Sequence, residues 1–319
     1  MCSSDLLLLG YIFLLKMMSH MQSRLGPMDP GGFHGWYQLI GDGIKFLQKE
    51  DIMPSEADRK VFALAPAIVV MSTFLVFVVI PAGPRMVVRD LDVGVFYALA
   101  VSSLSVIGVL MAGWASSNKY ALIGALRAAA QLIAYELPLV LAVVGVVVQA
   151  GTMSLQGIVL FQQDGAIFGF SGIGQPLILT QFVGFAIFMV AAQAELTQPP
   201  FDMPVAESEL VSGYMVEYTG FRFLFFFIGE FGTATAFAAI AATLFLGGWS
   251  IPGVHGTAAD LLGPIVLVTK LMAVAFIMFW VRFTYPRLRE DQLQAVAWKY
   301  LIPIALANVI VTAILKVAF

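Results

Sequence analysis

The chain has 319 residues, of which 60% are hydrophobic and only 12% are charged. Soluble domains carry roughly twice that share of charged residues, so the composition predicts an integral membrane protein. The formal net charge of −3 gives no reason to expect a nucleic-acid partner. The single cysteine, Cys2, excludes a disulfide framework, a zinc cluster and a protein-ligated iron–sulfur cluster.

Cofactor-binding patterns are missing from the sequence. The histidines His20, His34 and His255 are too scattered to suggest a metal or haem site. The chain contains no P-loop, no dinucleotide fingerprint and no nucleophile elbow. If the protein takes part in redox chemistry, we therefore expect the cofactors to belong to partner subunits.

Apolar runs divide the chain into candidate membrane spans, each near the roughly 20 residues that a bilayer requires. We find no repeat of obvious period and no soluble domain, so residues 1–319 are predicted to form a single transmembrane domain of about eight helices. The expected helices cover about 6–21, 61–81, 93–114, 126–150, 177–195, 222–246, 260–283 and 297–318.

The first segment is unusual. Only Leu6 to Leu15 is continuously apolar, and the opening Met-Cys-Ser-Ser-Asp looks foreign to the rest of the segment. No positive region precedes the apolar run and no small-residue cleavage site comes after it, so it does not read as a signal peptide. We expect the natural protein to begin with more residues than this sequence shows.

Lysine and arginine residues are distributed unequally between alternate loops, which predicts the orientation in the membrane. The loops after the second, fourth and sixth segments hold the fewest basic residues, namely Arg85 and Arg89. The odd-numbered loops are thus expected in the cytoplasm, with both termini outside. A cysteine at Ser117 or Ser208 should then react from the cytoplasm, and one at Gln162 from outside. The odd-numbered loops and their borders hold Arg24, Lys45, Lys49, Arg59, Lys60, Lys119, Arg127, Arg222, Arg282, Arg287 and Arg289.

Residues 33–48 form a second pattern in the first cytoplasmic loop. Apolar residues recur near helical spacing, with charged residues between them. This predicts an amphipathic helix, either on the membrane surface or packed on a partner. The apolar positions are Trp36, Leu39, Ile40, Ile44 and Leu47.

The stretch 195–217 is acidic and has no lysine or arginine, and none occurs between Arg127 and Arg222. Three prolines interrupt any helix here, which predicts irregular backbone lining a cavity. Crowding and desolvation would raise the pKa values of these carboxyl groups, as a proton path needs. The alternative is a solvated acidic loop, and Glu195 at the helix end is compatible with a headgroup position. The carboxylates are Glu195, Asp202, Glu207, Glu209 and Glu217.

Several ordered motifs carry a resemblance to a known family. Near the start, Arg24-Leu-Gly-Pro27 is followed by Asp42-Gly-Ile-Lys45 and Ala57-Asp-Arg59. The long stretch from Gly113 to Gln131 and the dipeptide Tyr135-Glu136 come next, and then Pro200-Phe-Asp-Met-Pro204 and the stretch from Glu207 to Gly213. The stretch from Trp280 to Gln292 completes the set. From Arg24 onward the chain closely resembles the H subunit (subunit 1) of respiratory complex I, the proton-pumping NADH:quinone oxidoreductase.

That resemblance implies a membrane-arm subunit in a bacterial plasma membrane, with no complete active site in this chain alone. It implies a chamber, formed with the hydrophilic arm, in which a quinone substrate is reduced, while iron–sulfur clusters and FMN lie in partner subunits. Small and antiporter-like membrane subunits are the other implied partners, and reduction is linked to proton translocation.

Site residues follow from the resemblance and from the cost of burying ionisable groups in lipid. Each has a structural alternative, such as a buried hydrogen-bonded carboxyl group, a loop charge or a helix-end anchor. The expected proton path is Glu136, Asp202, Glu207, Glu209, Glu217 and Glu230. The expected quinone-chamber residues are Arg24, Phe201, Asp202 and Glu209. The expected partner-docking residues are Lys49, Asp58, Arg59, Arg282, Arg287 and Arg289.

Two departures from the family pattern accompany the resemblance. Val205 stands where a further glutamate is often found, and Leu14 and Leu15 replace a Glu-Arg pair. Two other functions stay open at this point. One is the equivalent subunit of a membrane-bound hydrogenase or ferredoxin-type complex. The other is a stand-alone secondary transporter, although such transporters usually show paired broken helices and only one irregular stretch is seen.

Overall fold

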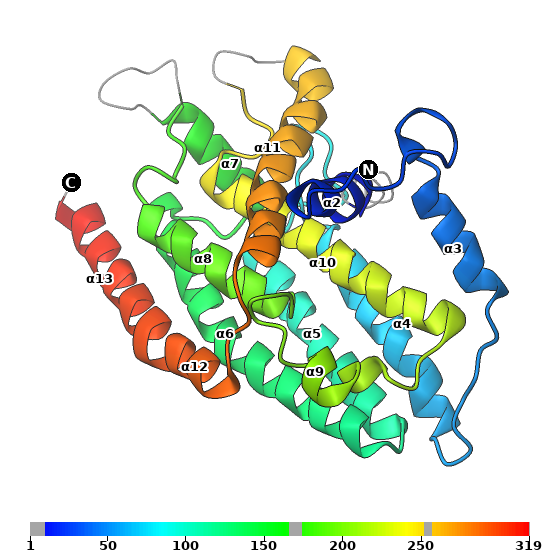
Figure 1. Ribbon diagram of the computed structural model, residues 1–319. Helices are drawn as coiled ribbons and strands as arrows, with labels where there is room; N and C mark the ends of the chain where they lie inside the picture. The colour runs from blue at the N-terminus through cyan, green and yellow to red at the C-terminus, as the bar shows by residue number, and fades with distance from the viewer. Residues whose placement is uncertain (1–9, 166–173, 252–256, 319) are drawn as a thin grey trace.

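A computed structural model describes residues 10–165, 174–251 and 257–318, and within them the protein is built of helices, without strands (Figure 1). Six of these helices are long and apolar enough to cross a membrane. The predicted class, an all-α integral membrane protein, is confirmed. The long helices are α4 (Arg59–Val76), α5 (Gly94–Ala115), α6 (Lys119–Ala150), α10 (Gly220–Phe245), α11 (Thr257–Thr284) and the combined α12 (Glu290–Ala295) and α13 (Ile302–Ala318).

Two of the eight predicted spans need separate description. Helix α8 (Phe182–Glu195) has 14 residues, fewer than the roughly 20 that a straight span needs. The first segment is described from Gly10 onward, as a π-helical turn, Gly10–Met17, followed by α2 (Met18–Met21). Residues 6–9 of that segment lie outside the described part of the chain.

Helix α7 (Leu155–Asp164) was not expected from the sequence. Ser154 caps it, because its side chain accepts a hydrogen bond from the amide of Gly157 at 3.1 Å. Its polar residues Gln156, Gln162 and Gln163 hide it from a hydropathy search. Gln162 is nevertheless only 2% exposed, and its amide donates to the carbonyl of Thr243 at 2.9 Å. Gln162 is therefore a poor place to probe the outer face by labelling.

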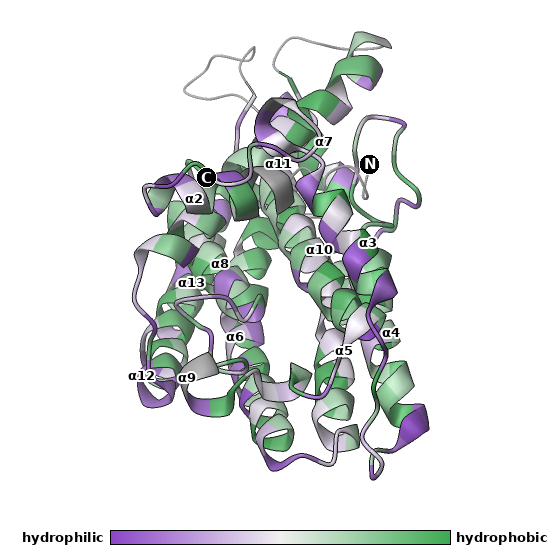
Figure 2. Ribbon diagram, turned by 45° about the vertical axis from the view of Figure 1, so that its right-hand side comes forward, coloured by the Kyte–Doolittle hydropathy of each residue, from purple (hydrophilic) through white to green (hydrophobic). Residues whose placement is uncertain are grey.

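Helix α6 is the longest of the described helices and lies against α5, α8 and α13 (Figure 1). Asn118 caps its start by accepting from the amide of Tyr120. Gly151 ends it with a left-handed φ of 76°, which glycine adopts without a steric cost. Figure 2 shows hydrophobic residues along the long helices and hydrophilic residues near their ends.

Small side chains set the spacing between α4 and α5. A β-carbon added at Gly108 would lie 2.6 Å from Val69 Cγ2 and 3.1 Å from the carbonyl oxygen of Ala65. Apolar side chains gain little by leaving lipid for another helix, so membrane helices rely on such close backbone approach. Glycine at position 108 permits that approach here.

The predicted amphipathic helix is present as α3 (Gln38–Gln48). Its apolar side chains Ile40, Ile44 and Leu47 are exposed, while Phe46 stacks on Phe223 of α10 with ring centroids 5.8 Å apart. One side of α3 therefore packs on this chain and the other is open to lipid or a partner.

We predict that a cysteine at Ser117 reacts with a membrane-impermeant reagent only from the cytoplasm, and one at Asp164 only from outside. Both side chains are exposed, and the Lys and Arg asymmetry places them on opposite sides. The measurement is labelling of the isolated subunit in sealed vesicles of known orientation. Labelling of both positions from one side would contradict this topology.

Candidate functional site

One face of α6 carries three polar side chains that hold the acidic stretch in place. Arg127, Gln131 and Tyr135 are spaced four residues apart, so they project from the same side of the helix. Gln131 is 1% exposed, and its amide donates to the carbonyl oxygens of Ala194 at 2.7 Å and Phe201 at 2.8 Å. A single side chain thus joins the end of α8 to the proline-rich segment.

Tyr135 extends the same face toward the last helix. Its hydroxyl donates to the carbonyl oxygen of Leu293 in α12 at 2.9 Å, and its ring lies 5.4 Å from the ring of Phe201. Leu288 donates its amide to the carbonyl oxygen of Pro200 at 3.0 Å. Helix α12 is therefore attached to α6, and the connection before it is attached to the acidic stretch.

The acidic stretch is irregular, as predicted, apart from the short helix α9 (Glu207–Leu210) and one 3-10 turn, Gly213–Met215. At Gly213 the φ angle is 55°, and an added β-carbon would overlap the carbonyl oxygen of Pro204. Only glycine fits such a close backbone approach. Val205, which stands where the family often has glutamate, packs against the apolar cluster containing Tyr214 and Phe226.

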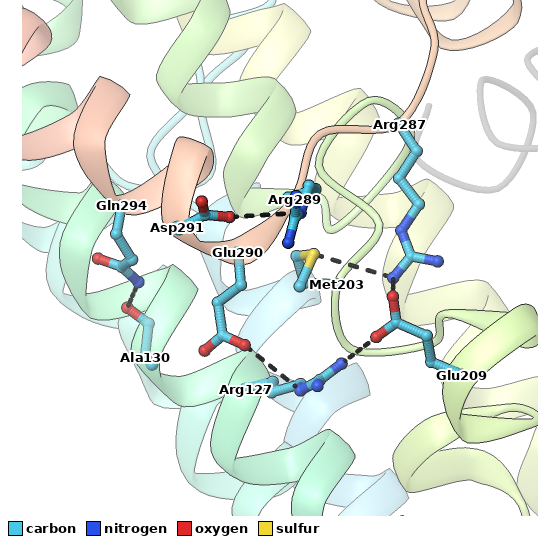
Figure 3. A network of polar contacts seen from close by, with 9 residues as sticks. All are labelled: Arg127, Ala130, Met203, Glu209, Arg287, Arg289, Glu290, Asp291 and Gln294. Atoms are coloured by element: carbon cyan, nitrogen blue, oxygen red, sulfur yellow. Dashed lines mark hydrogen bonds and ion pairs between the residues drawn. The ribbon is translucent and has the colours of Figure 1, made fainter.

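Glu209 is not an uncompensated carboxylate, contrary to the sequence-based expectation of a stretch without cations. Arg127 Nη1 donates to Glu209 Oε2 at 2.6 Å, and Arg287 Nη2 lies 3.6 Å from Oε1 (Figure 3). The hydrogen bond from Arg127, reinforced by the charge of Arg287, lowers the pKa of Glu209. The expected rise of its pKa by crowding is wrong, because the fold brings Arg127 of α6 and Arg287 of the connection between α11 and α12 to this carboxylate.

Asp202 shows the opposite behaviour. Burial raises its pKa to about 6, against the opposing charge of Arg287, while the charge of Glu230 adds to the rise. Two carboxyl groups seven positions apart thus differ in protonation because their surroundings differ. A pKa near neutrality is what proton transfer at physiological pH requires.

Next to the acidic stretch, three carboxylates from three different helices lie close together. Glu230 of α10 accepts a hydrogen bond from Gln198 at 2.9 Å and lies 3.7 Å from Arg282. Glu195 ends α8, and its Oε2 atom is buried without a hydrogen-bond partner among the described residues. Glu136 of α6 interacts electrostatically with Glu195.

A cavity of about 50 Å³ lies between Glu195 and Glu230. Glu195, Glu230 and Tyr214 line it, together with Thr233 of α10. Tyr214 also interacts with both Glu230 and Asp202, and burial raises the pKa of its hydroxyl. Such a volume holds a few water molecules at roughly 10–15 Å³ each. Glu195 therefore belongs to this cluster, since it lines the cavity and its Oε2 atom is buried.

Other predicted site residues lie apart from the cluster. Glu217 accepts a hydrogen bond from Asn118 at 2.6 Å, beside the start of α6. Arg24 is exposed and donates to Gln22 at 2.8 Å. Phe201 is 6% exposed and packs within this chain, so its predicted contact with quinone has no open surface here. The side chain of Glu207 lies outside the described part of the structure.

The predicted docking residues fall into two groups. Lys49, Asp58 and Arg59 are exposed, and Asp58 also caps α4 by accepting from the amides of Lys60 and Val61. Arg289 is exposed as well, near Asp291 at 3.8 Å. By contrast, Arg282 and Arg287 form ion pairs with carboxylates of this same chain.

Comparison with known proteins agrees with this architecture. The model of a family described as NADH dehydrogenase matches residues 5–313. The chain belongs to the NADH dehydrogenase family. This confirms the family resemblance predicted from the sequence.

Individual relatives extend the comparison. The chain is 46% identical over 310 residues to the H subunit of NADH-quinone oxidoreductase from Geobacillus kaustophilus (strain HTA426), covering 97% of this chain and 89% of the relative. It is 44% identical, with the same coverage, to the H subunits of that oxidoreductase from Bacillus thuringiensis subsp. konkukian (strain 97-27) and Bacillus cereus (strain AH187).

For this family member we predict that Gln131→Leu destabilises the acidic stretch. The substitution removes two buried hydrogen bonds, although both carbonyl groups keep one other amide partner. The expected cost is about 1–2 kcal/mol, seen as a fall of a few degrees in the thermal inactivation midpoint of the assembled complex. The control is Gln149→Leu, which loses only an exposed hydrogen bond with Thr180. Equal midpoints for the two variants would contradict the role of Gln131.

We also predict that Asp202 titrates near pH 6 in the folded protein. Because burial disfavours its charged form, the protonated form contributes stability at low pH, and that contribution is lost as pH rises through about 6. Infrared spectra should show a protonated-carboxyl band that disappears with that midpoint and is absent in Asp202→Asn. Asp164→Asn, at an exposed position, should keep the band. A band unaffected by Asp202→Asn would refute the assignment.

Proposed function

We propose that this chain is the H subunit of a proton-pumping NADH:quinone oxidoreductase. In this proposal it contributes membrane helices to the quinone-binding chamber and links quinone reduction to proton translocation. The family match and the names of the relatives support the complex. The six long apolar helices support a place in the membrane arm.

One observation supports the proton-path role most directly, namely the row of ionisable groups from the acidic stretch into the helices. Asp202 lies at the start, and Tyr214 interacts with both Asp202 and Glu230. Glu230 and Glu195 share the cavity, and Glu136 is the next carboxylate. Ionisable groups inside membrane helices are costly and usually serve function.

The chemistry follows from these positions. Asp202 exchanges protons near neutral pH, and the Tyr214 hydroxyl both donates and accepts hydrogen bonds. Water in the cavity would connect Glu230 with Glu195. Gln198 and Arg282 hold the Glu230 carboxylate in one orientation. Glu207 and Glu217 stay part of the proposed path from the sequence, while Glu209 serves as an anion that holds the segment.

The redox chemistry belongs to other subunits in this proposal. Quinone is the substrate, and iron–sulfur clusters and FMN lie in the hydrophilic arm. That arm would dock on the exposed side chains of Lys49, Asp58, Arg59 and Arg289. Arg24 and Asp202 would face the quinone chamber, while Phe201 packs within this chain behind it. Small and antiporter-like subunits would continue the path, within a bacterial plasma membrane and with both termini outside.

We predict that Glu230→Gln and Glu195→Gln lower quinone reduction and proton translocation together. Each change removes a titrating group but keeps a similar shape. Losing one acid–base step typically costs about 10²–10⁴-fold, so we expect at least about 10²-fold for Glu230. Turnover and proton uptake would be measured on assembled complexes in sealed vesicles.

Asp164→Asn is the matched control, because that carboxylate is exposed at the end of α7, away from the cavity. It should leave both rates unchanged. Wild-type rates in both glutamine variants, with normal assembly, would leave the carboxylates a structural role and refute the proposed path.

A further inference from the structure

One guanidinium group links three parts of the chain that are distant in sequence. Arg127 of α6 donates from Nη1 to Glu209 Oε2 at 2.6 Å, and its Nε lies 3.5 Å from Glu290 Oε2 (Figure 3). The planar guanidinium offers donors in fixed directions, so it can hold two carboxylates at once. The two carboxylates come from α9 and from the first turn of α12.

A second arginine, Arg287, contacts the other carboxylate oxygen of Glu209. Arg287 Nη2 lies 3.6 Å from Glu209 Oε1, and the same nitrogen lies 3.8 Å from the sulfur of Met203. Each oxygen of Glu209 therefore faces a different arginine. Figure 3 shows Glu209 between Arg127 and Arg287, with Glu290 on the other side of Arg127.

The backbone that these contacts hold is conformationally strained. Val211, two residues after Glu209, has a φ of 66°, a positive value that branched side chains rarely adopt. Val211 is also 63% exposed, so its own packing does little to stabilise that conformation. Residues in such conformations persist only where surrounding contacts fix them.

We propose that Arg127 is a positioning residue that joins the acidic stretch to the connection before α12 through Glu209 and Glu290. It touches no reacting group itself. It sets where the 203–213 segment lies relative to α6 and to residues 285–290, so that a displacement of one segment is transmitted to the other. The inference concerns placement of this segment and stands apart from the identity of the proton path.

The first test uses the assembled complex and hydrogen–deuterium exchange of peptides covering 196–213 and 285–295. In Arg127→Met we expect about 5-fold faster exchange in both segments. This fold-change corresponds to the upper part of the stabilisation measured for exposed ion pairs. Arg127→Lys should restore slow exchange in one segment but not in both. A lysine ammonium is a compact charge and lacks the fixed donors with which the guanidinium holds two carboxylates at once. Unchanged exchange in both segments of Arg127→Met would overturn the proposal.

The control is Arg85→Met, which also breaks an arginine–carboxylate pair, here with Asp260 at 4.0 Å. Arg85 follows α4 and so lies at the opposite end of that helix from its start at Arg59. Exchange in both segments should stay at the wild-type rate. Faster exchange there would mean that loss of any arginine loosens the segments, which also overturns the proposal.

Combined variants separate positioning from a general loss of stability. Glu290→Gln should speed exchange in 285–295 but leave 203–213 nearly unchanged. Adding Arg127→Met to Glu209→Gln should not speed exchange in 203–213 further, whereas additive effects there would contradict the link. If Arg127→Met fails to assemble, Arg127→Lys and Glu290→Gln still decide the outcome. Loss of proton pumping with wild-type exchange in Glu230→Gln concerns only the proton path.

Discussion

The arrangement of the site depends on the polar face of α6 formed by Arg127, Gln131 and Tyr135. A proline-rich segment at the end of a membrane helix makes only a few backbone hydrogen bonds of its own, and carbonyl groups with lost partners are costly where water is excluded. Gln131 supplies hydrogen bonds to two of these carbonyl groups, and Tyr135 supplies one to α12. Because the three side chains share one rigid helix, their spacing fixes the spacing of the segments that they hold.

The carboxyl groups of the acidic stretch differ in pKa because their surroundings in the fold differ, not because of their neighbours in the sequence. Glu209 lies between two arginines and stays charged, whereas Asp202 is buried enough to titrate near pH 6. Because their charge states differ, the two carboxyl groups suit different roles. The charge of Glu209 holds the loop, and in the proposed proton path Asp202 is the group that exchanges a proton.

The buried groups below the stretch show how a membrane protein accommodates ionisable side chains. Glu230 accepts a hydrogen bond from Gln198 and lies within ion-pair distance of Arg282, while Glu195 faces a small cavity shared with Glu230. The small residues that pack α4 against α5 keep this part of the bundle narrow, as Gly108 shows. Narrow packing around a few polar groups limits water to where those groups need it.

The sequence alone determined the helical membrane class, the order of the long helices, the amphipathic α3, the irregular acidic segment and the family. These features depend on local hydropathy, on proline positions and on contiguous motifs, which the chain shows directly. Helix α7 was missed because its glutamines break the apolar pattern, although Gln162 is buried by hydrogen bonds to α10. The shortness of α8 was also missed, because a turn precedes Phe182 within an apolar run.

Only the tertiary structure decided the charge partners. Arg127 and Glu209 are 82 positions apart, and nothing local in the sequence indicates that they meet. The sequence therefore suggested a stretch without cations, while the fold supplies Arg127 and Arg287 to Glu209 and Arg282 to Glu230. The fold also places Glu195 in the buried cluster and Glu217 beside the start of α6. Electrostatic interactions act through space, so the pKa values of these groups depend on packing between helices and not on neighbours along the chain.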